Sequence, residues 1–307
     1  MSAKSAGPTG GRPRFRAAFA FMLATPAAPV WLRSPLSPSS YTALRRRPAR
    51  RECLSDMAAT QPRFDAIDAL RGAAMLWMTA YHFAFDLNHF GHIRQNFYED
   101  PVWTWQRTGI VSLFLLCAGM GQVVAVQRGQ SWPRFARRWV QVAGCAALVS
   151  LGSLWMFPRS WISFGVLHGM AVMLLVTRWA LVRGWLRGAV PWLAGAALIA
   201  AAPLLGAALR TQAPAAMAAA FDSRWLNWLG VVTLKPPTED WVPLLPWLGV
   251  MWLGVGLMQW PMGRGWLARP PGAVGRALAP LGRWSLSYYM LHQPVLIGAL
   301  MAWAALR

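Results

Sequence analysis

The chain has 307 residues, of which 56% are hydrophobic and only 13% charged, and tryptophan alone occurs 20 times. This composition is far from that of a soluble domain and indicates a protein of the lipid bilayer. The formal net charge of +20 is high enough to suggest nucleic-acid binding, but most of the arginines flank apolar segments, as in the cytoplasmic loops of membrane proteins. We therefore expect the bilayer, and no nucleic acid, as a partner.

Residues 1–56 differ from the rest, since they are rich in Arg, Pro, Ser and Ala, and they predict a disordered basic tail. The stretch 17–30 resembles the apolar part of a signal peptide, but Pro26 and Pro29 interrupt it and it is too short to span. Alternatively, translation starts at Met57 and the tail is an artefact of gene annotation. In both cases a single transmembrane domain is expected over 57–307.

The remainder predicts an all-α, polytopic helix bundle. A spanning helix needs about 20 mostly apolar residues. By that rule we expect about seven transmembrane helices, with eight as an alternative. They are expected at 68–88, 108–127, 139–157, 161–182, 189–209, 241–260 and 284–304. The segment 225–234, "WLNWLGVVTL", is too short to cross and is expected to lie at the interface or to re-enter the membrane.

The charges of the loops predict the orientation. Every second loop is basic, with cations at Arg128, Arg134, Arg137, Arg138, Arg183, Arg187, Arg264, Arg269, Arg276 and Arg283. The intervening loops hold most of the acids, which are Glu99, Asp100, Asp222, Glu239 and Asp240. The positive-inside rule then places the N-terminus in the cytoplasm and the C-terminus outside. We expect a multi-pass protein of the inner (plasma) membrane.

The first predicted helix, "LRGAAMLWMTAYHFAFDL", contains three ionisable side chains, Arg71, His82 and Asp86. A charge inside hydrocarbon costs at least about 2.5–3.5 kcal/mol, so such residues usually have a function. At about 100° per residue, Arg71 and His82 project from one face, and Asp86 lies one turn beyond the histidine. The helix therefore presents a polar stripe to the bundle.

Two later segments carry further intramembrane histidines. In "WSLSYYMLHQPVLIGAL", Ser285 and His292 share a face, and Pro294 is expected to loosen the helix beside the histidine. His168 lies in "SFGVLHGMAVML". A neutral imidazole bonded to a neighbouring carbonyl or hydroxyl is common in packed membrane helices. We favour that structural role for His168.

Five stretches, taken in order, resemble the bacterial branch of the heparan-alpha-glucosaminide N-acetyltransferase catalytic-domain family. They are "FDAIDALRGAAMLWMTAYHFAFDL" with its R-x10-H spacing, "SLFLLCAGM", "FGVLHGMAVM", "DWVPLLPWLGVMWLG" and "LGRWSLSYYMLHQPVL". The acyltransferase-3 family of membrane acyltransferases is similar at a greater distance. The resemblance implies transfer of an acyl group, usually acetyl, from cytoplasmic acyl-CoA to a sugar amine or hydroxyl, such as that of a cell-envelope glycan.

Under this resemblance His82 and His292 are the candidate catalytic residues, because imidazole acts as base or nucleophile near neutral pH. Asp86 is expected to hold the imidazole tautomer. In animal members the catalytic histidine follows the first helix, so His89 and His92 are kept as alternatives. The candidate ligands for the phosphates of the co-substrate acetyl-CoA, or another acyl-CoA, are Arg71, Arg137 and Arg138, although snorkelling is the favoured role of the last two. No metal is expected.

Two other classes of function are compatible with the sequence. The intramembrane His and Asp residues also suit a proton-coupled transporter. A scaffold whose polar groups only join helices is the third hypothesis. The sequence leaves open the acceptor, the length of the acyl chain, transfer through an acyl-enzyme or directly, and whether the chain forms a homo-oligomer.

Overall fold

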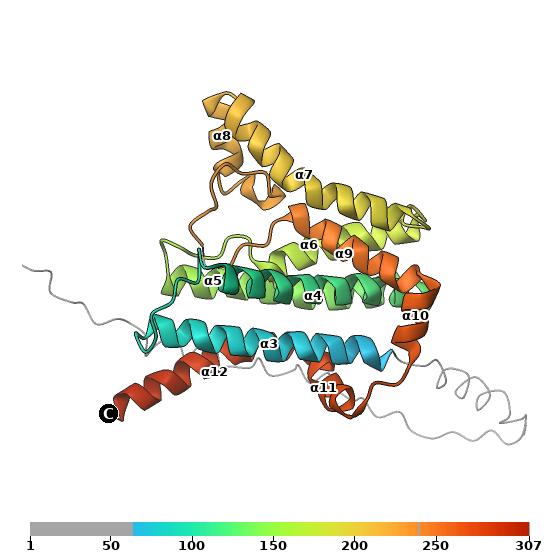
Figure 1. The fold of residues 1–307 in the computed structure, drawn as a ribbon, viewed down its shortest axis with the longest axis horizontal. Coiled ribbons are helices and arrows are strands. Elements are labelled where there is room, and N and C mark those ends of the chain that lie inside the picture. The colour runs from blue at the N-terminus through green and yellow to red at the C-terminus, as the bar shows by residue number, and fades with distance from the viewer. Residues whose placement is uncertain (1–63, 239, 307) are drawn as a thin grey trace, which may run out of the picture. The chain divides into compact units, whose positions relative to one another are not determined.

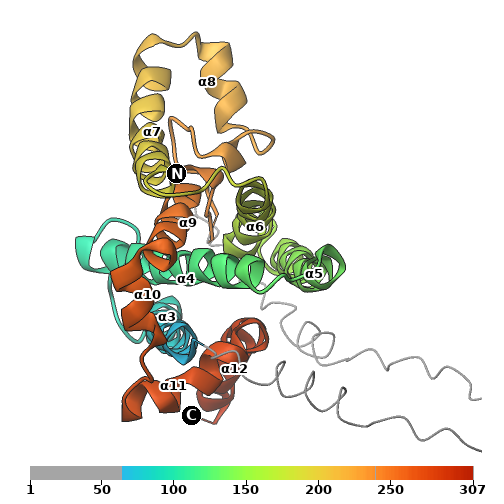
Figure 2. The same cartoon turned by 90° about the vertical axis from the view of Figure 1, so that its right-hand side faces the viewer.

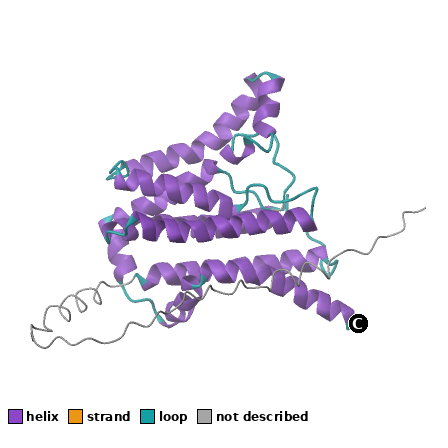
Figure 3. Cartoon of the chain, turned by 180° about the vertical axis from the view of Figure 1, so that it is seen from behind, coloured by secondary structure: helices purple, strands orange, loops and turns teal. Residues whose placement is uncertain are grey.

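The computed structural model describes residues 64–238 and 240–306, and within them the fold is all-α without a β-strand (Figure 1, Figure 3). The long helices are α3 (Asp65–His89), α4 (Pro101–Gln127), α5 (Trp132–Met156), α6 (Val166–Val182), α7 (Val190–Gln212), α9 (Leu244–Gln259) and α12 (Ser285–Ala305). The short ones are α8 (Ala215–Asp222), α10 (Pro261–Ala268), α11 (Ala273–Arg283) and the 3-10 turn η1 (Asn227–Leu229). The predicted basic tail, 1–56, lies outside the described residues.

Each segment in which a spanning helix is expected contains one long helix, in the same order. The fourth helix begins at Val166 rather than at 161, because the hydroxyls of Ser150 and Ser153 bond the carbonyl and N–H of Ile162 and hold the preceding segment as a loop. The segment 225–234 contains only η1 and ends its turn at Gly230. The helices α8, α10 and α11 were not expected.

The described helices differ in whether their length and apolar composition suffice to cross a membrane. By length and apolar composition, α4, α5 and α7 can each cross a bilayer, whereas α6 and α9 are apolar but have only 17 and 16 residues. The helices α3 and α12 have 25 and 21 residues but carry the polar side chains discussed below. The number of spans and their orientation stay predictions.

The helix α9 lies between α4 and α7, and glycines let the three backbones touch (Figure 2). A Cβ placed on Gly119 of α4 would collide with the carbonyl of Met251, and one on Gly254 of α9 would collide with the backbone of Leu116. The α7–α9 crossing uses Gly249 in the same way. Small residues at such crossings are typical of helix association in membranes, where lipid removes the hydrophobic driving force between helices.

The helices α3 and α11 pack in the same manner. A Cβ on Gly72 of α3 would meet the carbonyl of Leu278, and one on Gly282 of α11 would meet the carbonyl of Asp68. The helix α12 follows α11 after the single residue Trp284. The position of α11 on α3 therefore determines where α12 begins beside α3.

We expect Gly254→Ala to destabilise the protein by about 1–3 kcal/mol, because the added methyl meets only backbone atoms of α4, which cannot rotate away. Gly144→Ala in α5 is the control, since a Cβ there meets no atom within 4 Å. The thermal unfolding temperature in detergent measures both. Equal unfolding temperatures for wild type and Gly254→Ala would contradict the close crossing.

Candidate active site

The two candidate catalytic histidines, which lie 210 residues apart in the chain, meet where α12 packs on α3. His82 Nδ1 lies 2.8 Å from His292 Nε2, and the rings are nearly parallel, with an interplanar angle of 26°. His292 is only 7% exposed and His82 is partly buried. The structure thus brings together the two side chains that the sequence places on separate helices.

The contacts of His292 determine which nitrogens carry protons. His292 Nδ1 lies 2.7 Å from the carbonyl oxygen of Tyr289, which only accepts hydrogen bonds, so Nδ1 is the protonated nitrogen. In the neutral ring Nε2 is then an acceptor, and His82 Nδ1 must donate to it. It follows that Nε2 of a neutral His82 carries a lone pair and no proton. That nitrogen is the one available for chemistry.

Aromatic rings surround the histidine pair. Tyr288 stacks on His292 with ring centroids 5.9 Å apart, and its hydroxyl lies 2.7 Å from the hydroxyl of Thr79 on α3. Tyr81 lies edge-on to His82 at 5.8 Å. These contacts fix the planes of both imidazole rings.

Asp86 lies one turn beyond His82 and is 3% exposed. Its Oδ1 accepts a hydrogen bond of 2.7 Å from Nε2 of Gln293, the residue next to His292, and its Oδ2 has no partner among the described residues. In this geometry His292 and the Tyr289 carbonyl hold the His82 tautomer, which is the task expected of Asp86. Asp86 has no hydrogen bond to His82 in this structure, and its catalytic role stays a prediction.

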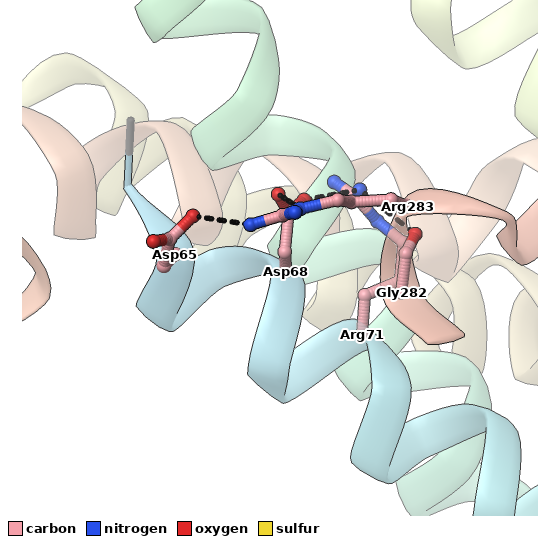
Figure 4. A network of polar contacts seen from close by, with 5 residues as sticks. All are labelled: Asp65, Asp68, Arg71, Gly282 and Arg283. Carbon is pink, nitrogen blue, oxygen red and sulfur yellow. Dashed lines mark hydrogen bonds and ion pairs between the residues drawn. The ribbon is translucent and has the colours of Figure 1, made fainter. Parts of the chain in front are cut away.

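Arg71 lies near the start of α3 in a network of ion pairs (Figure 4). It donates to Asp68 Oδ1 at 3.1 Å and to the Gly282 carbonyl at 3.5 Å. Arg283 pairs with both Asp65 and Asp68, at 2.9 and 3.5 Å. Two carboxylates thus balance two guanidinium groups, and Arg71 joins the C-terminal end of α11 to α3, where the helix dipole favours a cation.

The other predicted site residues lie away from the histidine pair. Arg137 and Arg138 are exposed in the second turn of α5, which packs on α6, and Arg138 donates to Gln141. His89 ends α3 and is exposed. His92 is exposed in the following loop and lies edge-on to Trp303 of α12. The catalytic and binding roles of all these residues stay predictions.

The contacts of His168 favour a structural role. Its Nδ1 accepts from the N–H of Gly165 at 3.2 Å, so its Nε2 carries the proton and donates to the Ser150 hydroxyl at 3.0 Å. That hydroxyl in turn donates to the Ile162 carbonyl. Both ring nitrogens are therefore used to fix the loop before α6.

Asp240 has a structural position that the sequence did not reveal. Its Oδ2 accepts a 2.8 Å hydrogen bond from the N–H of Val166, the first residue of α6, and a Cβ on Gly165 would collide with this oxygen. Burial raises the pKa of the Asp240 carboxyl to about 6, against the opposing effects of the Val166 N–H and the Arg107 guanidinium. The motifs "FGVLHGM" and "DWVPLLP" meet here.

Arg178 also escaped sequence analysis because it lies inside an apolar helix. It is 2% exposed, donates to the side chain and carbonyl of Gln130, and lies over the rings of Trp132 and Phe135. These contacts join the end of α6 to the start of α5. The signal in the sequence was an arginine inside the predicted span 161–182, near its end.

Apolar helices that cross through glycines, together with a histidine pair held between α3 and α12, are the features of a helical membrane protein with a candidate catalytic centre. The family model "Heparan-alpha-glucosaminide N-acetyltransferase, catalytic" matches residues 63–294. The chain belongs to this family, which makes it a membrane acyltransferase of the acetyltransferase type. Searches of the curated proteins and of the solved structures found no match. The more distant likeness to the acyltransferase-3 family stays an expectation.

Asp240 should make stability depend on pH. Because its pKa is raised to about 6 in the folded chain, the folded state binds more protons than the unfolded state between about pH 4 and pH 6. Stability should therefore fall as the pH rises through this range. Asp240→Asn, whose amide oxygen still accepts from Val166, should remove this part of the decline. Unfolding temperatures in detergent from pH 4 to pH 7 measure it, and parallel profiles for the two proteins would contradict it.

Proposed function

We propose that the chain transfers an acyl group, usually acetyl, from acyl-CoA to the amine or hydroxyl of a sugar acceptor such as a cell-envelope glycan. The observation that carries the proposal is the buried His82–His292 pair, which leaves the lone pair of His82 Nε2 free. Membership of the acetyltransferase family supports the reaction class. The loop charges support a multi-pass orientation in the inner membrane, with acyl-CoA supplied from the cytoplasm.

In direct transfer, His82 Nε2 removes a proton from the acceptor amine or hydroxyl as that group attacks the thioester carbonyl. The tetrahedral intermediate then collapses, the carbon–sulfur bond breaks, and the CoA thiolate receives the proton from His82. During this cycle His82 Nδ1 continues to donate to His292 Nε2. The pair therefore fixes the reacting nitrogen without itself losing a proton.

In transfer through an acyl-enzyme, His82 Nε2 attacks the thioester itself and expels the CoA thiolate. The acylated ring is cationic, and the acceptor then attacks its carbonyl carbon. The carbon–nitrogen bond to the ring breaks and restores neutral His82, and the proton that the acceptor loses balances protonation of the CoA thiolate. Both routes create positive charge on His82. Asp86, one turn away and without a cation of its own among the described residues, is placed to stabilise that charge.

Three arginines are the proposed ligands for the CoA phosphates. Arg137 and Arg138 are exposed and therefore accessible to an anion. Arg71 is already bonded to Asp68 and to Gly282, so a phosphate would share its remaining N–H groups. We infer that Arg71 stabilises the contact between α3 and α11 in addition to its proposed role in binding phosphate.

The first test of the proposal is thiol release from acetyl-CoA by purified protein with a panel of amino sugars and envelope glycans. His82→Ala should lower the acceptor-dependent rate by about 100-fold or more, as expected for loss of a base or nucleophile. His292→Gln places an amide near the position of Nε2 and should retain more activity than His292→Leu, which leaves His82 Nδ1 without an acceptor. Monodisperse elution serves as the folding control.

Unchanged thiol release by folded His82→Ala would contradict the assigned role and return His89 and His92 as candidates. Absence of thioester cleavage by the wild type on the whole panel would contradict the acyltransferase proposal. Proton-coupled uptake into proteoliposomes would then test the transporter hypothesis.

Substitution of Arg137 and Arg138 should change the binding of acyl-CoA, whereas substitution of Arg71 should change the stability of the protein. We expect Arg137→Ala with Arg138→Ala to raise the KM for acyl-CoA while leaving kcat and the unfolding temperature unchanged, because both side chains are exposed. Arg71→Ala should instead lower stability by about 1–3 kcal/mol, because Asp68 and the Gly282 carbonyl lose a charged donor. Steady-state kinetics and thermal unfolding measure both, and an unchanged KM for the α5 variant would exclude these residues as phosphate ligands.

A further inference from the structure

A cavity of about 360 Å³ lies between the start of α4, the second half of α7 and the segment that leads into α9. We call it the α4–α7 cavity. Its volume lies at the lower end of the range for small-molecule sites and suits one sugar unit or one lipid headgroup. Its polar and aromatic wall is formed by Arg107, Arg210, Lys235, Asp240, Trp241 and Trp247.

The cavity has an excess of positive charge. Three cations face one carboxylate among the described lining residues, and one oxygen of that carboxylate already accepts from Val166. Arg107 is half-buried, and neither it nor Arg210 has a hydrogen bond or ion pair with the described part of the chain. A half-buried guanidinium without such a partner is costly, and an oxyanion that accepts two of its N–H groups compensates for it.

Trp241 adds a second unsatisfied donor. Its indole Nε1 is buried and has no hydrogen-bond partner within the described residues. Buried polar groups are normally paired, so an unpaired N–H in the wall of a cavity indicates a missing acceptor. Gly230 also lines the cavity. A larger residue does not fit at this position, because the φ angle is 91° and a Cβ would collide with the Leu245 carbonyl.

The wall of the cavity also interacts with the residues around the histidine pair. Arg107 interacts electrostatically with both Asp240 and Tyr81, whose ring lies against His82. Asp240 in turn interacts with Tyr289, whose carbonyl holds His292. The cavity wall is therefore coupled electrostatically to side chains that contact the candidate catalytic pair.

We propose that the α4–α7 cavity is a binding site for an oxyanion, namely a carboxylate, sulfate or phosphate carried by a sugar or by a lipid headgroup. Arg107 and Arg210 bind its oxygens, and Trp241 Nε1 donates a further hydrogen bond. The flat indole rings of Trp241 and Trp247 border the remainder of the ligand. If the proposed function holds, a sugar bound here is the anionic part of the acceptor.

Binding is tested on the purified full chain by the shift in unfolding temperature with added ligand, at fixed ionic strength, because a ligand of the folded state raises that temperature. Glucuronate is compared with glucose, and short-chain phosphatidylglycerol with short-chain phosphatidylcholine. We expect at least one anionic probe to stabilise the protein while its neutral or zwitterionic counterpart does not. A glucuronate effect identifies a sugar acid as the source, and a phosphatidylglycerol effect identifies a lipid.

Three variants locate the site. Arg107→Gln and the exposed Arg210→Gln should each weaken binding of the effective probe by about tenfold or more, the usual scale for loss of a charged hydrogen bond. Trp241→Phe should weaken it less, since only one N–H is removed. Arg159→Gln removes the same charge from an exposed loop residue outside the cavity and should bind as the wild type does.

Two results would overturn the proposal. One is a stabilisation by anionic probes that survives in Arg210→Gln and in folded Arg107→Gln, and the other is the absence of any difference between anionic and neutral probes. The assay needs no thioester, so its outcome is separate from that of the proposed function. A chain that binds the anion but releases no thiol retains the site and loses the acyltransferase mechanism.

Discussion

The direct backbone contact between α3 and α11 is the constraint on which the candidate active site depends. Gly72 and Gly282 allow the two helices to touch. Arg283 of α11 forms ion pairs with Asp65 and Asp68 of α3, and Arg71 of α3 donates to the Gly282 carbonyl. Because one residue separates α11 from α12, this crossing sets the position at which α12 runs beside α3. The meeting of two histidine nitrogens at 2.8 Å is thus the result of packing near the other end of α3.

The contact between α3 and α12 shows how an apolar bundle accommodates polar chemistry. Three polar pairs join the two helices, namely Thr79 with Tyr288, His82 with His292 and Asp86 with Gln293. Unpaired polar groups in hydrocarbon cost several kcal/mol, so these pairs join the helices as well as arranging the site. Within these pairs His82 Nε2 keeps its lone pair, and Asp86 Oδ2 and Gln293 Oε1 have no partner among the described residues.

The apolar length of each segment was sufficient to predict the seven long helices, because a helix of that composition has few alternatives in a bilayer. The short helices α8, α10 and α11 escaped prediction, since 8–11 residues without long apolar runs give a weak signal. The spacing of the polar residues along the first and last predicted helices predicted that His82 and His292 face the interior of the bundle. This spacing did not predict that Asp86 binds Gln293, which depends on the rotation of α12, or that Asp240 binds a helix 74 residues earlier.

The hydrogen bond from the Val166 N–H, in the first turn of α6, to Asp240 limits how far the wall of the α4–α7 cavity can move. Gly165 leaves no free space beside the carboxylate, so the segment leading into α9 cannot shift unless the loop before α6 shifts with it. Asp240 also lines the α4–α7 cavity. A substitution that reshapes this part of the cavity wall would therefore also require a matching change in the loop before α6. The two segments would have to change together.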